Sequence, residues 1–114
     1  MDASKFVEIV KRSVCDTAVR DTLSNLEHPP GRRPPEDLVS RSNWFQALDE
    51  SQKTIVKEIV RSSVENAVFG FLSVLDGVRP VEDTREKGSF ELKFVKNGIA
   101  EVISPSDAFL HELF

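Results

Sequence analysis

The stretch from Glu50 to Gly77 constrains the fold of this chain more than any other. Apolar residues recur within it at the three- and four-residue spacings of a helix. They are Ile55, Val56, Ile59, Val60, Val64, Ala67, Val68, Phe71, Leu72, Val74 and Leu75. Asp49 and Gln52 have the spacing of a capping box, and a glycine at 77 favours a left-handed helix end. The sequence therefore predicts one long central helix over residues 50–76, about 40 Å in length.

The two halves of this predicted helix differ in their polar face. The first half has a charged side made of Lys53, Lys57, Glu58, Arg61 and Glu65, whereas residues 67–75 have none. A helix that is apolar all round is normally surrounded by protein. We therefore expect the second half, including Phe71, to be buried in the core.

A second apolar stripe predicts an amino-terminal helix from about Ser4 to Leu26. It contains Phe6, Val10, Val14, Ala18, Val19, Leu23 and Leu26. Cys15, the one cysteine of the chain, lies within this stretch, so an internal disulfide is excluded. We expect Cys15 to be a small core residue in a protein of a reducing compartment.

Residues 27–35 are rich in proline and predict a stiff connector between the first helix and the rest. They include Arg32 and Arg33, the one compact basic spot, which could hold a carboxylate of this protein or of a partner. A proline at 35 followed by two acidic residues then predicts a short connecting helix through about Arg41.

Trp44, the only tryptophan, follows that short helix. The simplest interpretation is that Trp44, with Phe45 and Leu48, closes one end of the helical core. The alternative is an exposed aromatic anchor of a protein interface, a role in which tryptophan and arginine are common. Trp44, Arg32 and Arg33 are therefore the candidate partner-binding residues.

The segment from Ser89 to Ile103 predicts a β-hairpin, because residues 89–95 alternate and residues 99–103 are rich in β-branched side chains. A two-residue loop at Asn97-Gly98 would place a charged residue opposite an apolar one. A three-residue loop over residues 96–98 pairs apolar residues with apolar ones and oppositely charged residues with each other, and we expect that register. It pairs Phe94 with Ala100, Leu92 with Val102 and Lys93 with Glu101.

The last residues predict a short helix that docks on the core. Phe109, Leu110, Leu113 and Phe114 share its apolar face. His111 comes four residues after Asp107, which is the spacing of a carboxylate that orients a general base. We interpret this pair as a surface contact, since no second reactive group accompanies it.

The composition predicts one domain over residues 1–114, with a real core. The net charge is −4 and no basic stripe with interleaved aromatics occurs, so we expect no nucleic-acid binding. No run of about 20 apolar residues and no secretory layout is present, and we expect a cytoplasmic protein without a membrane contact.

Motifs that carry chemistry are missing from the sequence. With two histidines and one cysteine, it lacks the ligand spacings of zinc and calcium sites, and it has no phosphate-binding glycine loop or nucleophile elbow. We therefore predict no catalytic residue, no metal site and no cofactor.

Residues 69–77, the following hairpin and the closing residues 110–114 resemble a pattern in small uncharacterised bacterial proteins, some of them similar to immunity proteins that block a toxin. The resemblance covers the carboxyl-terminal half and rests on packing motifs. It implies a protein partner and no catalytic residue.

These observations predict an α+β fold with a long central helix packed on an amino-terminal helix, a short connecting helix, a carboxyl-terminal hairpin and a short terminal helix. The expected function is that of a non-catalytic protein-binding module, immunity-like or an adaptor, whose negative charge suits a basic partner. A homo-oligomeric structural subunit, such as a homodimer, and a small enzyme with an unrecognised site are the alternatives.

Overall fold

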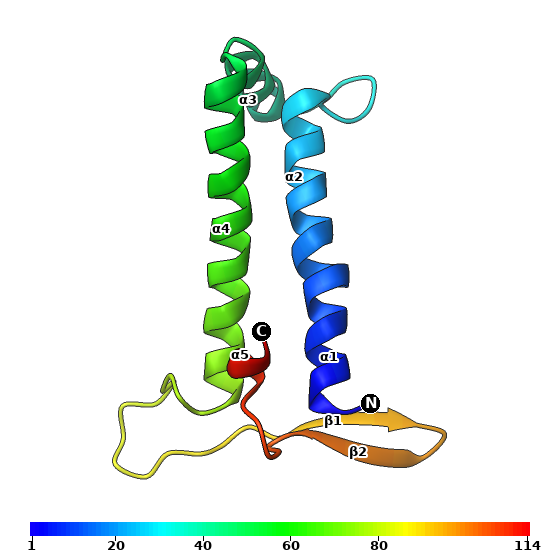
Figure 1. Cartoon of the computed structure of the whole chain (residues 1–114), viewed down its shortest axis with the longest axis vertical. Coiled ribbons are helices and arrows are strands. Elements are labelled where there is room, and N and C mark those ends of the chain that lie inside the picture. The colour runs from blue at the N-terminus through cyan, green and yellow to red at the C-terminus, as the bar shows by residue number, and fades with distance from the viewer. The chain divides into compact units, whose positions relative to one another are not determined.

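The structure, a computed structural model, describes residues 1–114 and confirms the α+β class (Figure 1). Five α-helices accompany one two-stranded antiparallel sheet. The elements are α1 (Ala3–Val10), the π-helical segment η1 (Lys11–Asp16), α2 (Thr17–Glu27), α3 (Glu36–Gln46), α4 (Glu50–Leu75), β1 (Leu92–Lys96), β2 (Ile99–Ser104) and α5 (Leu110–Leu113).

The chain forms two compact units. Unit 1 comprises Met1–Val14 and Asn66–Phe114, and unit 2 comprises Cys15–Glu65. That residues 1–114 fold as a single domain stays a prediction.

Helix α4 is the predicted long helix, and its ends have the expected chemistry. Asp49 and Gln52 form a reciprocal capping box, in which each side chain accepts the other residue's backbone N–H at 2.8 and 3.0 Å. Gly77 has a φ of 76°, the left-handed conformation that closes a helix. Local sequence signals therefore determine both ends of α4.

The amino-terminal helix is also confirmed, with an interruption that was not predicted. Asp2 caps its start by accepting the backbone N–H of Lys5 at 2.8 Å, and helical conformation continues to Glu27. The six residues of η1 have π-helical rather than α-helical hydrogen bonds. The apolar stripe of the sequence moves over by one residue near this point, from Ala18 to Val19, and a wider π turn accommodates such a step.

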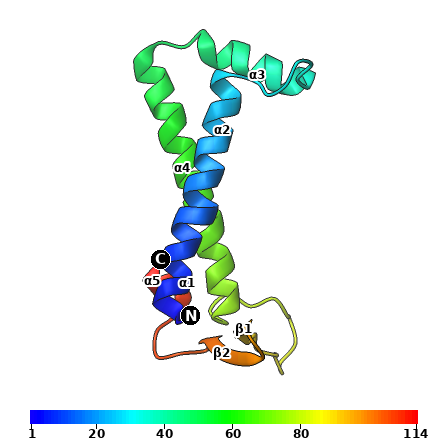
Figure 2. The same ribbon diagram turned by 90° about the vertical axis from the view of Figure 1, so that its right-hand side faces the viewer.

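Unit 1 has a small core built from four elements. Ala3 and Val7 come from α1, Leu72 from α4, Ile103 from β2 and Leu110 from α5, and all five are buried. Helix α1 packs against α5 and β2, as Figure 2 also shows. The half-buried side chains around this core are Met1, Phe6, Val68, Leu75, Leu92, Leu113 and Phe114. The last helix therefore docks on the core, as predicted.

In unit 2, α3 packs against α2 and satisfies its end. The Ser42 hydroxyl donates to the carbonyl oxygen of Leu26 at 2.8 Å, and the Gln46 amide donates to that of Glu27 at 2.9 Å. These carbonyls belong to the last turn of α2, where a helix lacks internal donors. Cys15 is buried, as expected. The connector that follows α2 contains no regular element before Glu36.

The predicted hairpin exists, but the three-residue loop was wrong. Strand β1 pairs with β2 through a two-residue turn, with Phe94 opposite Glu101 and Lys93 opposite Val102. Asn97 and Gly98 both have left-handed φ values, 52° and 75°, which is the conformation of the turn that matches strand twist. We had excluded this register because it pairs charged residues with apolar ones. Most of the hairpin is exposed, so burial does not require one face of it to be purely apolar.

None of the helices combines the length and the hydropathy that a membrane-spanning segment needs.

The observed turn predicts that Gly98→Ala destabilises the hairpin by about 1 kcal/mol, because the left-handed region costs an L-residue roughly 1–2 kcal/mol. Asn97→Gly is the matched control and should change stability by less than about 0.5 kcal/mol, since glycine tolerates the same φ. Denaturant unfolding followed through the amide signals of β1 and β2 measures both. Equal effects of the two substitutions would contradict the two-residue turn.

Candidate functional site

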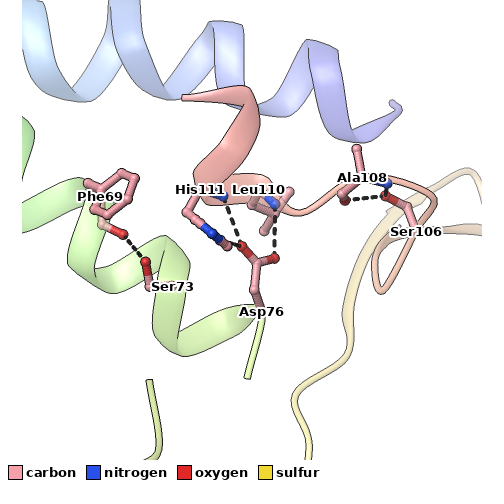
Figure 3. A network of polar contacts seen from close by, with 7 residues as sticks. All are labelled: Phe69, Ser73, Asp76, Ser106, Ala108, Leu110 and His111. Atoms are coloured by element: carbon pink, nitrogen blue, oxygen red, sulfur yellow. Dashed lines mark hydrogen bonds and ion pairs between the residues drawn. The ribbon is translucent and has the colours of Figure 1, made fainter. Parts of the chain in front are cut away.

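Asp76 follows directly after α4 and joins the end of that helix to α5. Its carboxylate accepts the backbone N–H groups of Leu110 and His111, each at 2.9 Å, and lies 2.6 Å from Nδ1 of the His111 ring (Figure 3). Only 1% of the Asp76 side chain is exposed. The first N–H groups of a helix have no partner inside it, and Phe109, which precedes α5, has no side chain that caps it. Asp76 therefore caps α5 from another segment and holds Leu110 in the core.

The protonation of Asp76 follows from these contacts. Burial alone would raise the pKa of this carboxyl group, but the hydrogen bonds from His111 and Leu110 outweigh it. The pKa of Asp76 therefore lies below its ordinary value, and the group is a carboxylate at neutral pH.

The expected pair between Asp107 and His111 was wrong. Asp107 is exposed and lies before α5 begins at Leu110, so the two residues are not separated by one helical turn. The carboxylate that binds His111 is 35 positions away in the sequence, on the other side of the hairpin.

A carboxylate that orients an imidazole is also part of several hydrolytic sites, where the imidazole activates a nucleophile. Here the Ser73 hydroxyl, drawn beside the pair in Figure 3, donates instead to the Phe69 carbonyl at 2.9 Å. The His111 ring is held by aromatic contacts with Phe69 and Phe109, whose ring centroids lie 5.5 and 5.4 Å away. The geometry favours a positioning role for the pair, which fastens α5 to α4.

An apolar groove lies between α1 and α4 in unit 1. Its volume is about 440 Å³. It is lined by Phe6, Val10, Val14, Ala67, Val68, Phe71 and Leu72. Phe6 and Val10 of α1 and Val14 of η1 form one wall at a spacing of four residues, and no lining residue is charged or polar. Leu72 is buried at its base, whereas Val14 and Phe71 remain 49% and 62% exposed.

The expectation that Phe71 is buried was therefore wrong. Phe69 is also 41% exposed, although both residues lie in the half of α4 that lacks a charged face. The periodicity correctly indicated an apolar surface, but the elements of this chain cover only the side that includes Leu72. The groove is the functional candidate that sequence reasoning missed, although the uncharged run at residues 67–75 was its signal.

Trp44 does not close a core. It lies on α3 with 57% of its surface exposed, and its neighbour Phe45 is the buried residue, at 1%. The exposed position is compatible with the alternative role of Trp44 as an interface anchor.

Arg32 and Arg33 are exposed in the loop between α2 and α3. Neither guanidinium forms an ion pair within the chain. Arg32, Arg33 and Trp44, the three predicted residues, all belong to unit 2.

The hairpin is a further exposed surface in unit 1. The sheet has two strands, so each strand keeps one edge without a hydrogen-bonding neighbour. Val95, Ile99 and Val102 are 63%, 69% and 46% exposed.

No cluster of three or more histidine, cysteine, aspartate or glutamate side chains is placed to hold a metal ion. No family model matches this chain, and no similar curated protein or solved structure was found. Its function is therefore inferred from its own residues.

The capping role of Asp76 predicts that Asp76→Asn lowers the unfolding free energy at neutral pH by about 1–3 kcal/mol, the cost of weakening hydrogen bonds to a buried charged group. Because the folded pKa of Asp76 is lowered, its contribution is complete above the unfolded pKa of about 3.9 and is lost as the pH falls through the folded value. The difference in unfolding free energy between wild type and Asp76→Asn should therefore shrink as the pH falls.

Asp107→Asn is the matched control, since this exposed carboxylate forms no hydrogen bond or ion pair. Urea unfolding of the three proteins at several pH values makes the comparison. A difference between wild type and Asp76→Asn that is as large at the acid end as at pH 7 would contradict the capping role.

Proposed function

We propose that this chain is a non-catalytic protein-binding module and that the apolar groove of unit 1 is its binding surface. The observation that carries the proposal is the exposure of Phe71, at 62%, beside a groove without a charged or polar lining residue. Contiguous exposed apolar surface on a small protein commonly marks an interaction site. Covering the rest of a phenylalanine side chain contributes about 1–2 kcal/mol to binding.

The lining of the groove favours a protein partner over a small molecule. The volume of about 440 Å³ would suit a small ligand, but ligand sites contain a few polar groups that fix the ligand's orientation. This groove has none. A helix with one apolar face needs no such groups, because it is recognised by side chains at three- and four-residue spacing, and the groove has helical walls of the same spacing.

We extend this proposal to the class of the protein partner and to the cellular compartment. The resemblance to immunity proteins suggests a toxin, and the single cysteine supports a reducing, cytoplasmic setting, since it excludes an internal disulfide. In the alternative of a small enzyme, His111 would be the reactive group, and turnover of a substrate would be lost in His111→Ala.

A benzophenone amino acid placed at position 71 tests the binding surface directly. Ultraviolet irradiation of native cells should yield covalent adducts between this variant and a protein, identified by mass spectrometry. The same probe at Val81, which is 61% exposed but lies outside the groove, is the control and should yield fewer adducts. Equal or no adducts from position 71 would overturn the groove as a binding surface.

The predicted residues of unit 2 constitute a second candidate contact. If they bind a partner, Trp44→Phe and the joint replacement of Arg32 and Arg33 by serine should weaken its capture at least about tenfold. The thermal midpoint should change little, because all three side chains are exposed. Loss of capture that always accompanies a lower midpoint would show that these residues are structural.

A further inference from the structure

We infer that the occupant of the groove is a second copy of this chain, which lays its own α1 and α4 against the same two helices in a two-fold symmetric dimer. This inference rests on the proposed function, because it names the partner of the same groove. Three properties of unit 1 support it: its small core, the shape of the groove face and the absence of charge on that face.

The core of unit 1 is small for the number of residues that it orders. Five hydrophobic residues form its buried core, whereas most of the chain's large exposed apolar residues belong to this unit. Below about 70–80 residues one core rarely contributes more than about 3–5 kcal/mol, and such units are usually supported by disulfides, metals or oligomerisation. The sequence has one cysteine, and the structure has no candidate metal cluster. A second copy, which is available wherever the chain is made, can supply further apolar burial to this unit.

The groove face has both a projecting side chain and a hollow, which a two-fold symmetric interface needs. In such an interface the same patch contacts itself, so a projecting side chain must find its hollow on the same face. Phe71 projects at one wall, and Val68 and Leu72 form a recessed apolar surface beside it. The Phe71 ring of each copy can therefore enter the groove of the other.

The uncharged lining of the groove favours a second copy of the chain over a basic partner as its occupant. The chain has a net charge of −4, so two copies that meet through most of their surface repel each other. The groove lining has no charged residue, and pairing there brings no like charges together. A basic partner would find no carboxylate in this lining, so the electrostatic steering expected from the net charge has no counterpart in the groove.

The surface area that a stable dimer must bury determines how the two copies are oriented. A stable interface buries about 800 Å² on each partner, which is more than one inserted ring supplies. The helices themselves must therefore lie along the groove, so that α1 and α4 of both copies form a four-helix arrangement.

Light scattering at micromolar concentration, combined with analytical ultracentrifugation, tests this inference. The wild-type chain should have twice the 12.8 kDa chain mass. Phe71→Glu should raise the dissociation constant of the dimer at least about 100-fold, because it removes an anchor from each copy and brings two carboxylates into an apolar contact. Val81→Glu adds the same charge at an equally exposed site outside the groove and should leave the dimer intact.

Salt supplies a second readout. An interface without charges should persist in about 0.5 M NaCl, where screening reduces the repulsion between two acidic chains. Mixing Phe71→Glu with Phe71→Lys should restore a dimer that neither variant forms alone, which a merely unfolded variant could not do.

The outcomes separate this inference from the proposed function. A wild-type monomer at about 100 µM, or a dimer that Phe71→Glu does not weaken, overturns the second copy as the occupant of the groove. If the benzophenone probe at position 71 then captures a different protein, the proposed function stands with another partner. If that probe captures no protein, both are wrong.

Discussion

The carboxylate of Asp76 is the contact on which the arrangement of unit 1 depends. It lies at the junction between α4 and the loop that leads to the hairpin, and it binds the start of α5 through Leu110 and His111 (Figure 3). Without it the four-residue helix α5 has no cap and too few residues to be stable alone. Because α5 supplies Leu110 to a core of five buried residues, one side chain connects the carboxyl terminus to the packing of α1 and β2.

That core covers only one side of α1 and α4. Val7 and Leu72 face it and are buried, whereas Val14 and Phe71 line the groove and stay exposed. A helix with apolar residues around most of its circumference needs protein on more than one side. The fold and the proposed binding surface therefore have the same physical origin, which is apolar surface that the elements of this chain cover on one side and leave exposed on the other.

The sequence was most informative where structure is local. The ends of α4 and the position of the hairpin are determined by neighbouring residues, and these features were predicted. The register of the hairpin was not, because we assumed a buried face that the structure does not have. The contact between Asp76 and His111 joins positions 35 apart, and no periodicity reports such a distance. Periodicity identified Phe71 as part of an apolar surface, but it does not tell whether that surface is covered by the same chain or by another.

The most direct test of this account is whether Phe71 contacts another copy. In a mixture of isotope-labelled and unlabelled protein, filtered NMR spectra detect only contacts between different chains. The account predicts intermolecular contacts from the Phe71 ring to the methyl groups of Val10 and Val14, which line the groove. Spectra that contain no intermolecular contacts, or only contacts between hairpin residues such as Val95 and Ile99, would contradict it.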